Sequence, residues 1–335
     1  MRASIVTVAY DSGPVLTRCV ESVVADDPDH EVVVVNNGHR GPEIEAVAAM
    51  PGVTVVESGG NLGYAAGSTL GAERASGDFL VFLNPDTTVM PGAIAALGHA
   101  LGDESIGIAM ARLRLMDDPD RLNSIGCAIH FTGLAWSDGY REPVDSVTEP
   151  REITYANGSA LAIRTGLFRE LGGFTPELFI YHEDLELGWR VRMRGLRIIV
   201  VPEADVMHEY DYGRNPKKNY FMERNRLIFV ASSYSGRLLV LVAPALVAAE
   251  VALSLVALRE GWFRDKLRGW GWIVRHVGWL SEHRRRIQSE RRVPDRELAR
   301  YLTAVIDPGM VDVPATARFA NPLLERYWSL VRRLA

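Results

Sequence analysis

The sequence predicts an α/β protein with a mostly parallel sheet flanked by helices, followed by a helical C-terminal extension. Over the first hundred residues, short apolar runs rich in β-branched residues alternate with amphipathic helical patterns. Strands covered on both faces have this composition, and the alternation implies right-handed βαβ units. Beyond residue 230 the strand patterns are replaced by long apolar, Trp-rich and Arg-rich stretches typical of helices.

Residues 1–99 are expected to form the ligand-binding half of the sheet. In sheets of this kind, ligands bind at the carboxyl ends of the strands. Polar groups fall at three of these ends: Tyr10-Asp11, Asn36-Asn37-Gly38 and Asn84-Pro85-Asp86. The strands are expected at 4–9, 32–35, 53–56 and 79–83, and the helices at 15–24, 44–50 and 65–75.

The middle section, residues 100–230, is less regular. A helix is expected at 165–171, and a second one from 183 to 194, where acidic residues suit the start and arginines suit the end of the helix dipole. Gly195 can take the left-handed position that ends this helix, and a strand is expected at 196–201. The predicted domains are therefore 1–230, divided into 1–99 and 100–230, and 231–335.

The two cysteines and the N-terminus indicate a reducing compartment. Cys19 and Cys127 lie in apolar surroundings without metal-ligand spacing, so we interpret both as small core residues. Met1 and Arg2 lead directly into an apolar strand, without the pattern of a secretory signal. We expect the catalytic part to be cytoplasmic.

Charge is unevenly distributed along the chain. Of 37 Lys and Arg and 42 Asp and Glu, residues 1–233 hold 20 and 32, a net charge of −12, and residues 234–335 hold 17 and 10, a net charge of +7. A basic tail on an acidic body is typical of contact with an anionic surface. Nucleic acid is not expected as a partner, because the body has no basic stripe with interleaved aromatic residues.

The tail, residues 231–335, carries the pattern of a membrane-interface segment. The apolar run 238–258 is long enough to cross a bilayer, but Pro244 and Glu250 disfavour a span. Four tryptophans then mix with arginines, as in interfacial helices. We expect peripheral contact with the inner face of the plasma membrane. The alternative is a helical subdomain or homo-oligomer interface.

Asn84-Pro85-Asp86 is a candidate metal motif. A carboxylate at a strand's carboxyl end can hold Mg²⁺ or Mn²⁺, which neutralises a leaving diphosphate. By itself the motif favours the alternative, a structural turn, because an Asn-Pro-Asp turn commonly caps the end of a strand.

Asn61-Leu62-Gly63-Tyr64 is a glycine-bearing turn before a helix. Glycine there permits close approach of a phosphate or sugar to the helix N-terminus. The turn lacks the spacing of dinucleotide-binding and P-loop motifs, which disfavours hydride and phosphoryl transfer. As a lone feature it is equally consistent with a tight turn.

Glu183-Asp184 and His208 complete the candidate set. A carboxylate in the first turn of a helix is stabilised in its ionised form and can act as a general base, although capping is the commoner role. His208 follows an apolar strand-like stretch and is either a metal ligand or a surface histidine.

Taken in order, these motifs resemble family 2 of the glycosyltransferases, in its rhamnosyltransferase-like branch. The resemblance covers about residues 3–230. It rests on Ile5-Val6-Thr7-Val8-Ala9-Tyr10-Asp11, Val34-Val35-Asn36-Asn37-Gly38, Asn61-x-Gly63-Tyr64, Leu83-Asn84-Pro85-Asp86, Gly172-Gly173-Phe174, Glu183-Asp184-Leu185-Glu186-Leu187, Trp189-Arg190, Pro202-Glu203-Ala204, His208 and Arg224-Asn225.

The resemblance implies a GT-A fold, a nucleotide diphosphate-sugar donor, a divalent cation (Mg²⁺ or Mn²⁺) and an inverting reaction. It implies that Asp86 is the metal carboxylate, that His208 contacts the metal or diphosphate, and that Asp184 is the base. The donor expected first is dTDP-L-rhamnose, ahead of UDP- and GDP-sugars, and the acceptor is a glycan or polyprenyl-linked glycolipid of cell-envelope polysaccharide synthesis. The implied substrate-binding residues are Thr7, Ala9, Tyr10, Asp11, Asn36, Asn61, Gly63, Asn84, Glu183, Trp189 and Arg190.

Two departures from the family pattern concern the donor site. Asn36 stands where the family often has Asp, so an amide carbonyl would accept from the base. Asn84 replaces the first Asp of the metal motif, which leaves Asp86 as its one charged ligand. Two other functions stay open: a sugar-phosphate nucleotidyltransferase, and a catalytically silent scaffold that binds nucleotide sugars.

Overall fold

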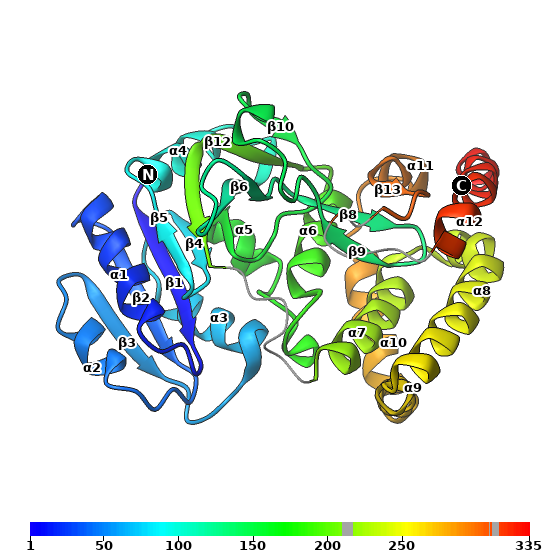
Figure 1. Cartoon of the computed structure of the whole chain (residues 1–335), viewed down its shortest axis with the longest axis horizontal. Coiled ribbons are helices and arrows are strands. Elements are labelled where there is room, and N and C mark those ends of the chain that lie inside the picture. Colours follow the sequence, from blue (N-terminus) through cyan, green and yellow to red (C-terminus); the bar gives the residue numbers. More distant parts are fainter. Residues whose placement is uncertain (210–216, 308, 310–314) are drawn as a thin grey trace. The chain divides into compact units, whose positions relative to one another are not determined.

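The computed structural model describes residues 1–209, 217–307, 309 and 315–335 (Figure 1). The chain forms two compact units. Unit 1 comprises Met1–Cys127, Ser137–Val191 and Leu196–Asp211, and unit 2 comprises Ala128–Trp136, Arg192–Gly195 and Tyr212–Ala335. The predicted boundary at 230/231 therefore differs from the division of the structure, because helix α7 (Lys218–Ser233) packs against helices of unit 2.

Unit 1 is built on a sheet whose N-terminal part is parallel. Strands β1 (Ala3–Ala9), β2 (Glu31–Asn36), β3 (Val53–Glu57) and β4 (Phe79–Leu83) lie in the order β4-β1-β2-β3, and all three pairings are parallel. Each strand agrees with its predicted range to within one residue at either end. Burial on both faces explains why β1, β4 and the central residues of β2 are apolar without alternation, whereas β3 at the edge of the sheet is partly exposed.

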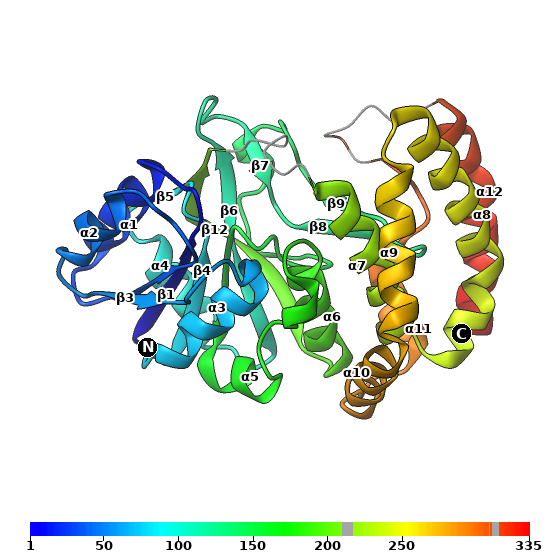
Figure 2. The ribbon, with the colours of Figure 1, turned by 90° about the horizontal axis from the view of Figure 1, so that it is seen from below.

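Helices cover both faces of this parallel part. Figure 2 shows α1 (Val15–Asp26) and α2 (Glu43–Ala48) on one face and α3 (Gly63–Arg74) on the other. The helix α3 lies close to the sheet because it is lined with small residues: a Cβ on Gly71 would come within 2.4 Å of Val6 Cγ1. These helices confirm the predicted βαβ pattern.

The remainder of the sheet is mixed. Strand β11 (Ala160–Arg164) runs antiparallel to both β4 and β6 (Ile106–Leu115), and β12 (Arg197–His208) is parallel to β6. The other elements of unit 1 are β5 (Thr87–Val89), α4 (Ala93–Ala100), β7 (Leu122–Ser124), η1 (Val144–Ser146), β10 (Arg151–Glu152), α5 (Thr165–Glu170), η2 (Pro176–Leu178) and α6 (Glu183–Met193).

Strand β12 is twice as long as the predicted strand at 196–201. The predicted strand ended at residue 201, but after a register shift between Val201 and Asp205 the strand resumes pairing with β6. A bulge of this kind tolerates the missing proline N–H. The extension places His208 at the far end of the strand, which positions the candidate site.

Unit 2 is mainly helical. It contains α7, α8 (Gly236–Glu260), α9 (Phe263–Arg275), α10 (Val277–Ser289), α11 (Asp295–Leu298), η3 (Ala299–Tyr301) and α12 (Ala315–Leu334). A small sheet joins β13 (Leu302–Thr303), β8 (Cys127–His130) and β9 (Ala135–Ser137). Helix α8 lies between α9 and α12 and contacts both (Figure 2).

Both cysteines are buried and free, as predicted. Burial raises the pKa of the Cys19 thiol to about 12, and it also raises the pKa of Cys127. Neither thiol is therefore a nucleophile at neutral pH.

Candidate active site

Asp86 and His208 come together at the carboxyl edge of the sheet. Strand β5 pairs with the end of β12, so that His208 lies opposite Thr87. The Nε2 atom of His208 is 3.4 Å from Oδ1 of Asp86, and the backbone N–H of Glu209 donates to the carbonyl of Asp86 at 2.9 Å. Both side chains are therefore held by the same strand pairing.

Asn123 orients the imidazole of His208. Its Oδ1 lies 2.8 Å from His208 Nδ1, and both side chains are buried. Because an amide oxygen only accepts, this contact assigns the proton to Nδ1 and leaves the lone pair of Nε2 directed toward Asp86. Sequence reasoning missed Asn123, which no motif marks, because strand β7 brings it to the site.

The Asp86 and His208 pair fits a divalent cation. A carboxylate oxygen and a neutral imidazole nitrogen facing each other are suitable ligands for Mn²⁺, and the carboxylate also suits Mg²⁺. Among the described residues, no group of three or more His, Cys, Asp or Glu side chains could hold a metal. Asp86 and His208 would therefore supply the protein ligands, and phosphate oxygens and water would complete the shell.

The turn that carries Asp86 is held by hydrogen bonds to Ser159, the residue before strand β11. The backbone N–H of Asn84 donates to the carbonyl of Ser159 at 2.9 Å, and its Nδ2 donates to Ser159 Oγ at 3.1 Å. The hydroxyl of Thr87 donates to the carbonyl of Asn84 at 2.7 Å. Asn84 therefore shapes the turn through its backbone and its amide group.

Asp184 lies in the first turn of α6 with its carboxylate fixed by two backbone donors. Gly158 N–H donates to Oδ2 at 2.9 Å, and Leu185 N–H donates to Oδ1 at 2.7 Å. Burial raises the pKa of Asp184, and these two hydrogen bonds oppose the rise. A raised pKa brings a carboxylate toward the working pH, where a general base is most effective.

Tyr64 supports the loop that holds Asp184. Its hydroxyl donates to the carbonyl of Gly158 at 2.8 Å, and Gly158 in turn donates its N–H to Asp184. The ring of Tyr64 packs near Phe174, with centroids 6.0 Å apart. Sequence reasoning placed Tyr64 in a motif without a role, and the structure connects that motif to the candidate base.

Glu183 is buried, and the pKa of its carboxyl group is raised well above 4.5. Burial is the main cause and the nearby charge of Asp184 is the second. Its Oε2 atom is buried without a hydrogen-bond partner among the described residues. This environment differs from that of an exposed first-turn acid, and it favours the protonated form.

The residues before α6 adopt an unusual backbone. Phe179, Tyr181 and His182 have φ of 65°, 67° and 68°. Each such conformation costs a non-glycine residue about 1–3 kcal/mol, so the surrounding contacts must hold it. The carbonyl of Phe179 accepts the N–H of Ala65 at 3.1 Å, and a Cβ on Gly63 would lie 2.5 Å from that carbonyl. Gly63 therefore accommodates Phe179.

The side-chain amides of Asn36, the last residue of β2, and of Asn37 form hydrogen bonds to neighbouring segments of the chain. Asn36 donates through Nδ2 to Glu57 at 3.0 Å and accepts from His39 N–H at 2.9 Å. Asn37 is buried, and it accepts from Leu62 N–H at 2.8 Å while donating to Asn61 Oδ1 at 3.2 Å. The sequence placed Asn37 in a motif without assigning it a role, and these hydrogen bonds make it a structural residue.

The candidate residues of β1 and those of the loop that follows it differ in solvent exposure. Thr7 and Ala9 are buried, and the Thr7 hydroxyl has no hydrogen-bond partner among the described residues. Tyr10 is 55% exposed, and Asp11 is exposed with φ of 49°. Tyr10 and Asp11 are the members of this set whose side chains are accessible to a ligand.

Trp189 and Arg190 are packed inside unit 1, contrary to the prediction that they bind substrate. They are 1% and 3% exposed. The guanidinium of Arg190 pairs with Glu186 at 2.8 Å and donates to the carbonyls of Leu171 and Gly173 at 2.6 and 2.7 Å. These contacts satisfy the guanidinium inside the protein, so its role is to anchor α6.

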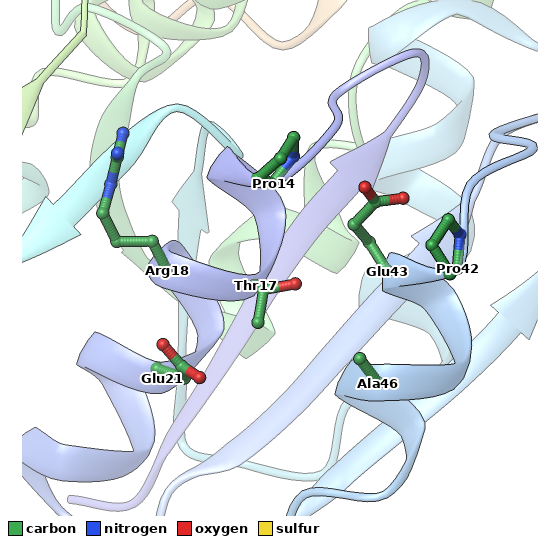
Figure 3. Close-up of a pocket in the computed structure, with 7 residues that line it drawn as sticks. All are labelled: Pro14, Thr17, Arg18, Glu21, Pro42, Glu43 and Ala46. Atoms are coloured by element: carbon green, nitrogen blue, oxygen red, sulfur yellow. The ribbon is translucent and has the colours of Figure 1, made fainter.

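A separate hollow of about 390 Å³ lies between α1 and α2 (Figure 3). Its lining contains none of the residues expected to bind the donor. Glu21 and Glu43 outnumber its single cation, Arg18, and this charge balance does not suit a diphosphate. The lining residues are Pro14, Thr17, Arg18, Glu21, Pro42, Glu43 and Ala46.

Comparison with known proteins identifies the family. The sequence model of "Glycosyl transferase family 2" matches residues 4–172, which is just over half of the chain. The chain belongs to this family. The glycosyltransferase is 29% identical over 263 residues to the N-acetylglucosaminyl-diphospho-decaprenol L-rhamnosyltransferase of Mycobacterium tuberculosis, an alignment that covers 69% of this chain and 85% of that protein.

Solved structures share the fold of the glycosyltransferase. GalNAc-T7 with UDP, GalNAc and Mn²⁺ aligns with a TM-score of 0.60 at 20% identity, over 69% of this chain and 48% of that one. S. aureus TarS 1–349 in complex with UDP-GlcNAc aligns with a TM-score of 0.54 at 13% identity, over 99% of this chain and 91% of that one. The chain has a GT-A fold with a C-terminal helical extension, as predicted.

Proposed function

We propose that this glycosyltransferase moves a sugar, with L-rhamnose from dTDP-rhamnose as the first choice, onto a polyprenyl-linked or other glycan acceptor of cell-envelope polysaccharide synthesis. The proposal is supported by two carboxylates in unit 1. Asp184 accepts hydrogen bonds from two backbone N–H groups, and Asp86 lies beside the imidazole of His208. The donor and acceptor classes rest on similarity to the mycobacterial L-rhamnosyltransferase.

Asp184 is proposed as the general base. Its carboxylate accepts the proton of the acceptor hydroxyl while the acceptor oxygen bonds to the anomeric carbon of the donor. The bond from that carbon to the diphosphate oxygen breaks in the same step, and the nucleoside diphosphate leaves with the electron pair. Attack opposite the leaving group inverts the anomeric configuration.

Asp86 and His208 are proposed to hold a divalent cation beside the diphosphate. A cation bound there would neutralise the negative charge that develops on the leaving group. Asn123 keeps the imidazole of His208 in the tautomer that presents Nε2, and outer partners of this kind tune the affinity of metal sites.

The proposal is tested by donor binding and product analysis. Thermal-shift measurements with dTDP-rhamnose, UDP-sugars and GDP-sugars, each with and without Mn²⁺, should identify the donor, since a ligand of the folded state raises the melting temperature. Transfer to a synthetic lipid-linked N-acetylglucosaminyl diphosphate should give a product of inverted anomeric configuration by NMR. Retained configuration, or binding unaffected by Mn²⁺, would contradict the mechanism.

The two alternative functions make different forecasts. A silent scaffold would bind a nucleotide sugar without releasing nucleoside diphosphate in the presence of any acceptor. A nucleotidyltransferase would form a nucleotide sugar from a sugar phosphate, and membership in the glycosyl transferase family speaks against it. Release of nucleoside diphosphate that depends on acceptor favours the proposed transfer over both.

A further inference from the structure

Helix α8 of unit 2 carries a continuous apolar stripe on its outward side. Five of its aliphatic side chains are 57% to 74% exposed, with spacings of three, four or seven residues that put them on one helical face. At 1.5 Å per residue the stripe is about 27 Å long. Its members are Val240, Val247, Val251, Leu255 and Leu258.

A second side of α8, about a quarter turn from the stripe, is tied to its neighbours by charge. Glu250 pairs with Arg226 of α7 and, at 3.1 Å, with Lys266 of α9, and Trp270 Nε1 donates to it at 3.2 Å. Lys266 also reaches Glu223 at 2.6 Å, and the Lys266 side chain is fully buried. Two acidic and two basic side chains therefore form a neutral cluster, which would be lost if α8 rotated Glu250 away from α7 and α9. The members are Glu223, Glu250, Arg226 and Lys266.

This cluster separates two interpretations of α8. By length and composition, α8 is the one described helix that could cross a membrane, with a mean hydropathy of 2.4 over 18 residues. Insertion across a bilayer would surround the helix with lipid and remove Glu250 from its cations, leaving buried charges unpaired. The paired inward face and apolar outward face instead suit a helix that lies in the plane of an interface.

A second apolar stripe lies on α12, which packs against α8. The Tyr327 hydroxyl donates to the carbonyl of Leu241, which fixes the two helices together. The stripe comprises four side chains that are 45% to 84% exposed, again at spacings of four and seven residues. They are Phe319, Leu323, Leu330 and Leu334.

Arginine side chains lie on the same helices as both apolar stripes. Arg237 and Arg259 lie near the two ends of α8, and Arg332 and Arg333 lie in the last turn of α12. Outside the neutral buried cluster, the sequences of α8 and α12 together hold six arginines and two glutamates, so these two helices carry a net positive charge. A second copy of this face would bring like charges together, whereas anionic lipid headgroups would neutralise them.

We propose that the α8 and α12 stripes dock unit 2 flat on an anionic bilayer, with the aliphatic side chains in the acyl boundary and the arginines among the lipid phosphates. The proposal deepens the proposed function, because a membrane surface would present the lipid-linked acceptor. Docking itself needs neither donor nor acceptor, so it can fail or succeed independently of sugar transfer.

Vesicle binding by the full chain tests the docking face. The protein should sediment with phosphatidylcholine vesicles that contain phosphatidylglycerol, and should bind vesicles of phosphatidylcholine alone at least about tenfold more weakly. The double variant V247E/V251E should lose about tenfold or more of the binding to anionic vesicles, because charge enters the exposed stripe. Both valines are exposed, so its melting temperature should match that of the wild type.

Two controls separate lipid from other occupants. Met90→Glu places one glutamate, half the charge added by V247E/V251E, on an exposed apolar residue of unit 1 and should leave vesicle binding unchanged. Salt or alkaline carbonate should release the bound wild type, and resistance to both would indicate a spanning helix and overturn the proposal. If the wild type does not bind vesicles but forms a dimer that V247E/V251E converts to a monomer, the face is an interface with a second copy of the chain. Equal binding of V247E/V251E and the wild type to anionic vesicles would also overturn the docking proposal.

Discussion

Replacing Asp184 by asparagine tests the catalytic assignment most directly, and the structure predicts more than one effect. In the wild type, both carboxylate oxygens accept a backbone N–H, one from Gly158 at 2.9 Å and one from Leu185 at 2.7 Å. An asparagine amide has a single accepting oxygen. Its NH₂ group must therefore face one of the two N–H donors, which loses that hydrogen bond.

The expected loss of stability follows from this geometry. A hydrogen bond to a charged group contributes about 1.5–3 kcal/mol, and a buried N–H left without an acceptor costs a similar amount. For a unit of about 200 residues, each kcal/mol lowers the melting temperature by about 2–4 °C. Asp184→Asn should therefore melt roughly 3–12 °C below the wild type, while turnover falls by about 10²–10⁴ through loss of the base.

The assay combines melting temperature, donor affinity and single-turnover rate at a temperature where the variant is fully folded. Asp26→Asn is a matched control, because Asp26 also accepts a backbone N–H, from Gly92 at 2.5 Å, at the far end of α1. That variant should turn over normally. An Asp184→Asn enzyme within about threefold of wild-type turnover would refute the base assignment. Unchanged stability would refute the hydrogen-bond argument.

Three further predictions concern neighbouring residues. Asp86→Ala should abolish the Mn²⁺ dependence of donor binding, measured by thermal shift, and should lower turnover by about 10²-fold or more, measured by nucleotide release. Metal-dependent activity in this variant would contradict the assignment of Asp86 as a metal ligand. Because burial holds the folded-state pKa of Glu183 above its ordinary value of 4.5, the wild type loses stability as pH rises from 4.5 through the folded-state pKa. Glu183→Gln lacks this loss, so denaturant unfolding should favour the variant increasingly from about pH 4 to pH 7, and a difference independent of pH would contradict the protonated assignment. Tyr64→Phe should lower the free energy of unfolding by about 0.5–1.5 kcal/mol. It should also move the acid limb of the kcat profile to higher pH, because a looser Gly158 N–H lowers the pKa of Asp184 less; an unshifted limb would limit Tyr64 to packing.

Much of the fold of unit 1 could be predicted because its signals are local. The run at 79–83 is apolar throughout, and strand β4 occupies those five residues. Helix α6 begins at Glu183, where the acidic first turn predicted it, and Gly195 takes φ of 82° beyond its end. Hydrophobic periodicity, dipole-matched charges and glycine conformations act within a few residues of the chain, so they can be read without knowledge of what packs nearby.

The candidate site was only partly accessible from sequence. The resemblance singled out Asp86, Asp184 and His208, but the contacts that orient them come from Asn123 and Gly158. No periodicity marks an asparagine in a three-residue strand or a glycine in a loop as a partner of a distant side chain. For the same reason, the sequence suggested a ligand role for Arg190, whose guanidinium the fold encloses.

The sequence by itself determined which residues form the parallel strands and their helices, and where polar groups end those strands. Tertiary structure alone decided that β11 runs antiparallel between β4 and β6, that β12 continues past Pro202 to bring His208 beside Asp86, and that Glu250 turns inward on α8. Strand pairing and burial of charge depend on segments far apart in the chain. Their energies exist only once those segments are packed together, so no local pattern encodes them.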